Sequence, residues 1–529
     1  MSVPAEIRAV PRPVNTVVDN TGKVGPKQYP VRMRTDTKYV SGGNPQPHNG
    51  RVIGHIVDGR FVPRQARAAT DGPDMLSYGL SAFIWSVSDD ILKDLESTFD
   101  VKQAHAIYTV AALRAQKPHI SDRKLASEYD RCFLSKFCPG VPLSKNSVGK
   151  LESDLGKDTQ KQAAFFKKRW DAVSAEHHVA IDGSLIQDTS KINDLSDYSR
   201  KSRTKGCLDI SLLYAYDIET GEPVCCKVYP GNCNDASNFH DFVESNGINH
   251  GIIIADKGLP PKKIRDLLAK YKNLHYLIPV KRNDSRIKTH KLYEYQGILK
   301  GLERNVLYKK VPLGDGRFLY SFKDAAQDAK ENRTYLEKSK KTQTYSFDDY
   351  ARRRERFGTI VFESDQDLSP VTIYKNYQKR WLLELVFRQY KRSEYLDQTR
   401  VQSDFSVSGS EFVNFIATLI TCRLIAKAED AGLLDEQSFG DLKDDLSQAW
   451  RKTGSSAEPA SDDGQWVHTI KQALESLEAL GLSKPVPKPE PKKKGRHSKK
   501  IGPKPEFVGP KRPRGRPRKN HSAEAPRDI

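Results

Sequence analysis

The sequence predicts a mixed α/β protein in which a helix-covered sheet follows a mainly helical N-terminal region. Between residues 76 and 170, apolar residues recur at spacings of three and four, the period of a buried helix face. From residue 171 onward, short runs rich in β-branched residues alternate with helical segments, which is typical of a mixed sheet. The 529 residues are enough for two or three cores.

The charge of the chain favours a polyanionic partner. Lys and Arg number 87 against 67 Asp and Glu, a formal net charge of +20. Residues 484–519 carry fifteen Lys and Arg and two acids, and so hold thirteen of the twenty net charges. Double-stranded DNA is therefore the first partner to test, ahead of an acidic small molecule.

Cysteine usage and hydropathy predict a cytoplasmic protein. The seven cysteines form no matched Cys-x-x-Cys pairs, which fits free thiols in a reducing compartment. The first twenty residues lack the apolar core of a signal peptide. The longest apolar stretch, residues 412–426, contains Asn414 and Arg423 and is shorter than the roughly 20 residues that span a bilayer. We expect a buried helix there and no membrane partner.

The N-terminal part is expected to contain a loose arm and a DNA-binding region. Residues 1–36 mix Pro, Val and basic residues without a period, which favours a disordered or loosely attached arm. Residues 37–170 should hold a short strand ribbon followed by helices. Two short helix candidates, residues 121–135 and 142–155, are compatible with a helix-turn-helix or with two ordinary packed helices.

Residues 171–280 are predicted to form the first part of the sheet. The run from 177 to 182 ends in Asp182, and the next two runs are joined by residues 219–222, a hairpin signature. A helical segment then precedes an apolar run that ends in Asp256, and a second helical segment precedes the last strand. Asp182 should lie at the end of the first strand and Asp256 at the end of the fourth.

The remaining chain divides into an insertion, a second part of the core and a tail. Residues 281–370 show strand-like runs around a Gly-Asp-Gly turn and are too long for a connecting loop, so we expect a β-rich inserted subdomain. Residues 371–480 should supply a long helix and further helices to the core. Residues 481–529 form a basic tail that cannot build a core and should be disordered.

Four polar residues share one face of the predicted helix 377–391. Tyr377, Arg380, Glu384 and Lys391 fall within about 60° of one another on a helical wheel. A solvated face with local ion pairs is the simplest explanation of such a stripe. The two strand-end aspartates suggest another, although each alone is also a common turn residue.

Asp182, Asp256 and Glu384 converge if the helix packs across the sheet, because catalytic groups collect at strand ends in α/β sheets. Three close carboxylates repel one another unless a divalent cation neutralises them. Oxygen ligation selects Mg²⁺, with Mn²⁺ as the alternative, and two ions about 4 Å apart can clamp both oxygens of a phosphodiester displacement. Tyr377, Arg380 and Lys391 would then hold DNA phosphates.

Here the sequence resembles the DDE insertion-sequence transposases that carry a Tyr-Arg-Glu-Lys signature, the IS-four-like group. The signature has two, three and six residues between its members, as have Tyr377, Arg380, Glu384 and Lys391. The two aspartates fit the family's other motifs, which read here Asp182-Gly183-Ser184 and Ala255-Asp256-Lys257-Gly258. The resemblance covers about residues 179–425.

The resemblance implies an RNase H-like mixed-sheet catalytic core with a β-rich insertion before the glutamate helix. It implies Mg²⁺-dependent cleavage at the terminal inverted repeats of an element, followed by attack of the 3′-hydroxyl on target DNA. Asp182, Asp256 and Glu384 would be the catalytic metal ligands. A homodimer on DNA and a nucleoid-associated prokaryotic protein are also implied.

One feature of related enzymes has no counterpart in the sequence. They stack a flipped base on a tryptophan of the insertion, but no tryptophan lies between Trp170 and Trp381 here. Either Phe318 or Tyr320 takes that role, or the reaction has no hairpin intermediate.

The tail contains a segment that resembles an AT-hook. Arg514, Arg516 and Arg518 lie in a Pro-Arg-Gly-Arg-Pro-Arg-Lys run, whose extended arginines suit the narrow minor groove of A·T-rich DNA. A generic polybasic tail is the alternative, and both bind through counterion release. For the whole chain, the alternatives to a transposase are a metal-dependent nuclease without strand transfer and a non-enzymatic protein that binds AT-rich DNA. The presence of all three acids argues against the last.

Overall fold

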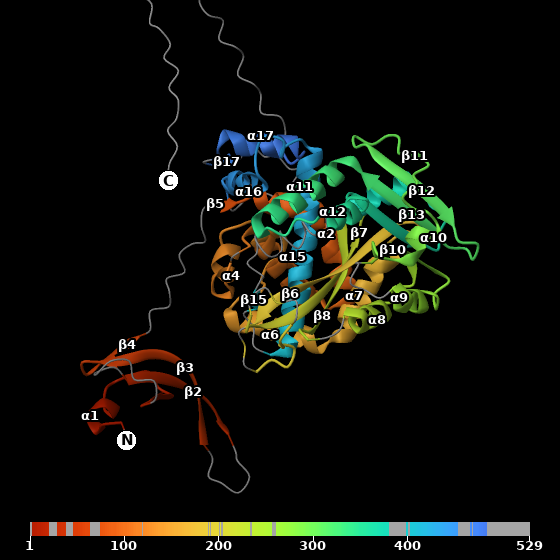
Figure 1. Cartoon of the computed structure of the whole chain (residues 1–529). Helices are drawn as coiled ribbons and strands as arrows, with labels where there is room; N and C mark the ends of the chain where they lie inside the picture. Colours follow the sequence, from red (N-terminus) through yellow and green to blue (C-terminus); the bar gives the residue numbers. More distant parts are fainter. Residues whose placement is uncertain are drawn as a thin grey trace, which may run out of the picture. The chain divides into compact units, whose positions relative to one another are not determined.

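The computed structural model describes most of the chain outside the tail. The described residues are 3–20, 29–38, 46–63, 75–118, 120–188, 190, 192–199, 202, 205–232, 235–255, 261–379, 398–399, 403–452, 466–467 and 469–483. Within them the protein is a mixed α/β structure (Figure 1). The predicted tail, residues 481–529, lies almost wholly outside them.

An antiparallel four-stranded sheet forms near the N-terminus, in the order β1-β2-β3-β4. Its elements are α1 (Ala5–Arg8), β1 (Thr16–Val18), β2 (Tyr29–Lys38), β3 (Gln46–Val57) and β4 (Arg60–Pro63). Asp58 and Gly59 both have positive φ at the β3–β4 turn, as a tight hairpin of right-handed twist requires.

The loose arm expected over residues 1–36 is not what the structure shows. A small core holds this region together, and its buried members lie far apart in sequence: Val3, Val10, Val18, Val31 and Ile56. The first three valines share no helix or strand period, because they pack in one cluster with residues of β2 and β3 rather than along a single element. Local periodicity therefore carried no signal of this core.

Six helices follow, as predicted for the N-terminal region. They are α2 (Gly79–Thr98), α3 (Val101–Gln116), α4 (Asp122–Tyr129), α5 (Leu134–Phe137), α6 (Lys145–Lys157) and α7 (Thr159–Asp171). Side-chain caps begin several of them: Asp100 accepts from the backbone N–H of Gln103, and Ser144 from that of Ser147. The two helix-turn-helix candidates correspond to α4 and α6.

The central sheet has five strands from the predicted core. They are β6 (His178–Asp188), β7 (Leu208–Asp217), β8 (Glu222–Pro230), β9 (His250–Ile254) and β10 (Asn273–Val280), with α8 (Asp235–Ser245) and α9 (Pro261–Leu268) between the last three. Their order is β10-β9-β6-β7-β8. Strands β6, β9 and β10 are parallel, whereas β7 and β8 form the predicted antiparallel hairpin.

The region predicted as a β-rich insertion extends the same sheet rather than forming a separate one. Strands β11 (Gly297–Ile298), β12 (Val306–Pro312), β13 (Phe318–Asp324) and β14 (Thr359–Ser364) continue it beyond β10, all antiparallel. The region also contains α10 (Ser285–Thr289), α11 (Ala325–Thr342) and α12 (Phe347–Arg354), and it leads to α13 (Pro370–Lys379).

The C-terminal helices complete the core. β15 (Gln398–Thr399) runs parallel to β6, and α15 (Asp404–Asp430) follows, packed against α6. α15 is long and apolar enough to cross a bilayer, but most of its apolar stretch is buried in the protein. The chain then forms α16 (Phe439–Ser447), β16 (Trp450–Lys452), β17 (Trp466–Val467) and α17 (Lys471–Ala479). β16 lies between β17 and β5 (Met75–Ser77).

α15 and α6 approach each other more closely than side chains would allow. A methyl group on Gly156 would lie 1.7 Å from the carbonyl oxygen of Phe405, and one on Gly409 would lie 1.8 Å from that of Glu152. These glycines let the two backbones touch. One face of α6 is thus committed to the core.

Candidate active site

Asp182 lies in the middle of β6 rather than at its end. The sequence Asp-Gly-Ser suggested a turn, but β6 continues to Asp188 because its residues from Val179 onward pair with β7, including Asp182 with Tyr214. The first four residues of β6 are buried, and Asp182 is the first that is half-buried. Its carboxylate accepts a 2.9 Å hydrogen bond from the backbone N–H of Gly183. The strand therefore delivers this carboxylate to the point where β6 leaves the core.

β9 lies beside β6, and the pairing of the two strands bears on the predicted neighbourhood of Asp182 and Asp256. The two strands are parallel, and their last pair joins Ala180 to Ile254. Asp182 follows Ala180 by two residues, and Asp256 follows Ile254 by two residues in the sequence. Asp256 itself lies outside the described residues.

α13 packs on the face of the sheet to which Asp182 belongs. Tyr377 of α13 stacks edge-to-face on Phe362 of β14, with ring centroids 4.6 Å apart. Phe362 pairs with Pro279 of β10, and the register across β10, β9 and β6 puts Phe362 on the same face as Asp182. The structure thus brings Asp182 and Tyr377, two of the predicted residues, to one face.

Two buried polar anchors fix α13, and neither could be predicted from the sequence. The side-chain amide nitrogen of Asn376 lies 2.8 Å from Nδ1 of His178 and donates a 3.0 Å hydrogen bond to Glu219. The hydroxyl of Tyr374 donates a 2.7 Å hydrogen bond to Asp324. Asn376 thereby ties the helix to the strand that carries Asp182, and Tyr374 ties it to the inserted strands.

The other predicted site residues cannot be placed. Asp256, Glu384, Arg380, Lys391 and the tail residues Arg514, Arg516 and Arg518 all lie outside the described residues. The chain is described up to Lys379 and again from Gln398, which pairs with Gln187 of β6. The segment that contains Glu384 therefore starts from a helix on the face of Asp182 and ends beside β6.

A second group of metal-ligand side chains lies at the start of β6. Ligand atoms of His177, Asp217 and Glu219 are within 4.8 Å of one another. Both carboxylates are already well bonded: Asp217 to Nδ1 of His177 and to the backbone N–H of Glu219, and Glu219 to His178 and Asn376. Burial raises the pKa of Glu219, but the hydrogen bonds from His178 and the charges of His178 and His177 together lower it by more. This group is a closed polar cluster that supports α13.

Tyr320 does not fit the predicted role of stacking on a flipped base. Its side chain is fully buried, and its hydroxyl donates to the carbonyl of Gln366 and accepts from the backbone N–H of Leu368. Residues of β13 alternate between the two faces of the sheet. The sequence alone does not show which face is buried, so the burial of Tyr320 could not be predicted. Exposed aromatic rings of the inserted region are Tyr345 and Phe347, 55% and 70% exposed.

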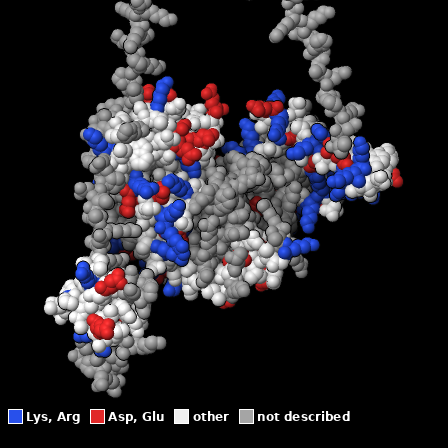
Figure 2. Space-filling view, turned by 90° about the vertical axis from the view of Figure 1, so that its left-hand side faces the viewer, with Lys and Arg blue, Asp and Glu red and all other residues white. Residues whose placement is uncertain are grey.

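Basic side chains are not confined to the tail. Figure 2 shows one face of the molecule, on which Lys and Arg gather in several groups with some Asp and Glu between them. Such groups supply the phosphate contacts that a DNA-binding protein needs.

Comparison with known proteins finds a family model that matches the part of the chain from β6 into α15. Residues 174–419 match the family model described as "Transposase DDE domain", and they include Asp182, Tyr377 and the positions of Asp256 and Glu384. The cryo-EM structure of a piggyBac transposase synaptic complex with hairpin DNA is 14% identical, with a TM-score of 0.35, over 70% of this chain and 80% of that chain. No curated protein matches the chain. Residues 174–419 match a transposase DDE domain, and the protein is an enzyme that cleaves and joins DNA.

Proposed function

We propose that the protein cleaves the terminal inverted repeats of its element and joins the 3′-hydroxyl ends to target DNA. Asp182, Asp256 and Glu384 are its catalytic carboxylates and the ligands of Mg²⁺, or of Mn²⁺ in its place. The parallel register of β6 and β9 is the observation that carries this proposal, because its last pair, Ala180 with Ile254, precedes each aspartate by two residues in the sequence. Residues at equivalent positions share a face and lie one strand spacing apart, about 4.8 Å.

The proposed core is RNase H-like. β6, β7 and β8 form an antiparallel meander, and β9 and β10 add on the other side of β6, parallel to it. α13 leads from the inserted strands toward Glu384 and is held against the face of Asp182. In the proposed arrangement the insertion separates the second aspartate from the glutamate in sequence, and the three carboxylates would meet at one metal site.

Each site residue has a separate task. The carboxylates are oxygen donors, which suit Mg²⁺. The bound ions would supply charge stabilisation to the attacking and leaving oxygens of the phosphodiester. Tyr377, Arg380 and Lys391 hold phosphates near the scissile bond, where guanidinium and ammonium groups match their charge. Arg514, Arg516 and Arg518 of the tail bind the minor groove of A·T-rich DNA.

We further propose the Tyr-Arg-Glu-Lys group as the closer affiliation, together with a homodimer that holds two element ends and a nucleoid-associated location in a prokaryotic cytoplasm. Residues 37–170 contribute to DNA binding, and residues 481–529 act as a basic tail. A size measurement on the complex with one end duplex tests the stoichiometry, since a single chain per complex would contradict the dimer.

An end-cleavage and strand-transfer assay on an inverted-repeat duplex tests the function. The wild-type chain with Mg²⁺ should nick at the end and join the 3′-hydroxyl to a target duplex. The Asp182→Ala, Asp256→Ala and Glu384→Ala variants should bind the duplex and leave it uncut. Cleavage without joining would favour a nuclease, and near-wild-type cleavage by a variant would remove that residue from the site.

A further inference from the structure

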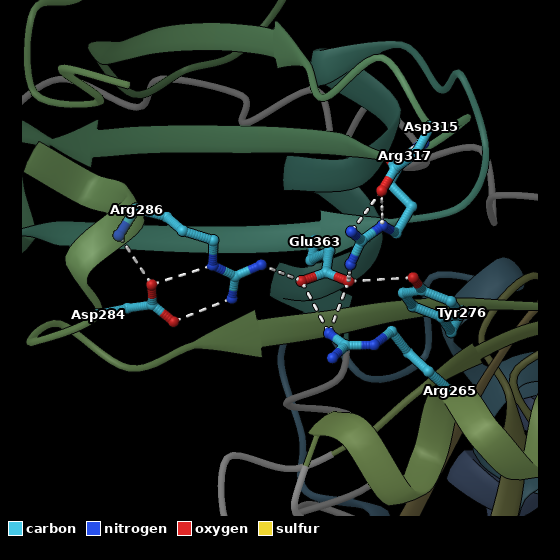
Figure 3. A network of polar contacts seen from close by, with 7 residues as sticks. All are labelled: Arg265, Tyr276, Asp284, Arg286, Asp315, Arg317 and Glu363. Carbon is cyan, nitrogen blue, oxygen red and sulfur yellow. Dashed lines mark hydrogen bonds and ion pairs between the residues drawn. The ribbon is translucent and has the colours of Figure 1, made fainter. Parts of the chain in front are cut away.

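A buried carboxylate gathers three arginines at the border between the core strands and the inserted strands. Glu363 of β14 is 1% exposed. It accepts hydrogen bonds from Arg265 at 2.9 Å, Arg286 at 2.5 Å and Arg317 at 3.3 Å, and from the hydroxyl of Tyr276 at 3.0 Å. Figure 3 shows the arginines reaching it from three directions, from α9, α10 and the β12–β13 turn. A single buried anion thus fixes three cations.

The three arginines differ in how much of their binding capacity is used. Arg286 is also held by Asp284, through two hydrogen bonds of 2.9 and 3.0 Å, and Arg317 is also held by Asp315. Arg265 contacts Glu363 through one terminal nitrogen, Nη1, which reaches both carboxylate oxygens. Among the described residues no second acid contacts it, and Figure 3 shows its other terminal nitrogen outside the network.

The three arginines are held by a buried carboxylate and are themselves partly exposed to solvent. The side chains of Arg265, Arg286 and Arg317 are 27%, 28% and 33% exposed, whereas that of Glu363 is 2% exposed. Lys262, one turn before Arg265 on α9, and Lys288 on α10 add exposed positive charge, with Asp266 as an exposed acid nearby. A guanidinium held on one edge offers its remaining N–H groups in a fixed fork, which is the geometry that binds phosphate oxygens.

This cluster lies on the face of the sheet opposite to Asp182. Paired residues of neighbouring strands share a face, and successive residues along a strand alternate. The registers of β14, β10, β9 and β6 put Glu363, Tyr276 and Val179 on one face. Asp182 follows Val179 by three residues, an odd number, and therefore belongs to the other face. The three arginines consequently belong to a surface separate from the catalytic carboxylates.

We propose that Arg265, with Arg286 and Arg317 beside it, binds backbone phosphates of duplex DNA on this second face. The inference rests on the proposed function for its choice of polyanion. DNA fits because its phosphates repeat along a strand and can engage several cations held at one place. Arg265 should contribute most, since it alone of the three has no second acid among the described residues. Glu363 acts as a positioning residue that keeps the three guanidiniums together.

A salt titration of DNA binding by the full-length chain tests the proposal. Affinity for an element-end duplex is measured without Mg²⁺ over a range of NaCl concentrations for the wild type and Arg265→Gln. Losing one phosphate contact should weaken binding about tenfold at low salt and reduce the slope of log K against log salt by about 1. Arg333→Gln is the matched control, because it removes the same charge from an 82% exposed i,i+4 pair on α11.

The outcomes separate this proposal from the catalytic one. An unchanged slope for Arg265→Gln, or an equal change for Arg333→Gln, overturns the phosphate contact. If Arg265→Gln unfolds at a lower temperature than the wild type, the Arg265→Lys variant decides. Lysine keeps the charge and the ion pair with Glu363 but loses the forked N–H groups of the guanidinium. A severalfold weaker affinity for DNA then supports the phosphate contact, and a wild-type affinity refutes it. The binding titration contains no Mg²⁺ and therefore does not depend on cleavage. A chain that binds DNA as expected in this titration, but does not cleave it in the separate assay with Mg²⁺, would refute the proposed function alone.

Discussion

The stability of the fold should depend on the negative charge of one buried residue, Glu363. Burial raises its pKa, but the hydrogen bond from Arg286 and the charges of Arg265 and Arg286 lower it by more. Its folded-state pKa therefore lies below the value of about 4.3 that an unfolded chain shows. A depressed pKa contributes stability that is complete above about pH 4.3 and is lost as the pH falls through the folded-state value.

The Glu363→Gln variant should reveal this contribution. At neutral pH it leaves three arginines without their buried partner, so the free energy of unfolding should fall by about 3 kcal/mol. The gap between variant and wild type should narrow as the pH falls from 5 toward 3, because the wild-type carboxylate becomes protonated. Thermal unfolding at a series of pH values measures the gap. A constant gap would mean that the glutamate charge has no role in the network.

Among the elements, α13 matters most for the proposed site, because it leads toward Glu384. Its anchors were unpredictable because their partners are distant in sequence: Asn376 and His178 are 198 residues apart, and Tyr374 and Asp324 are 50 apart. The hairpin, the N-terminal helices and the buried α15 could be predicted, because turn chemistry and helical periodicity are local. The length of β6 could not, since pairing with β7 overrides the Gly183 turn signal. Burial of Tyr320 likewise depends on which face each strand residue takes.

Asn376→Ala should test α13 as the support of the segment that carries Glu384. Without the amide, the helix loses its tie to β6, and end cleavage should fall about 100-fold, since small misplacements of catalytic groups are that costly. The Mg²⁺ concentration for half-maximal cleavage should rise. Tyr374→Phe is the control: it removes the tie to Asp324, whose carboxylate also caps α11, and should leave the Mg²⁺ requirement unchanged. Equal effects of the two variants would reduce Asn376 to a stability role.

The contact between α6 and α15 allows a stability test. Gly156→Ala places a methyl group against the carbonyl oxygen of Phe405 and should lower the free energy of unfolding by about 3 kcal/mol. Gly149→Ala on the same helix meets nothing within 4 Å and should raise it by about 0.5 to 1 kcal/mol, because alanine is the better helix former. Chemical denaturation measures both. Similar values for the two variants would contradict the close packing.

For the molecule as a whole, most of the net positive charge, and with it much of the expected attraction to DNA, lies in the C-terminal residues. Thirteen of the twenty net positive charges belong to residues 484–519. Deleting residues 484–529 should therefore weaken DNA binding and flatten its salt dependence, because fewer counterions are released. Cleavage should persist at saturating protein concentration. An unchanged salt slope after deletion would show that the tail does not touch DNA.

Asp182, Asp256 and Glu384 are proposed to hold the same metal ions. Calorimetric titration of Mn²⁺ into the full-length chain on its end duplex measures this binding. Asp182→Asn, Asp256→Asn and Glu384→Gln, which keep side-chain size but remove a charged ligand, should each abolish the high-affinity binding. Asp89→Asn, which removes a carboxylate from an exposed i,i+4 pair on α2, should leave it intact. Wild-type Mn²⁺ binding by any of the first three variants, or its loss in Asp89→Asn, would contradict a shared site.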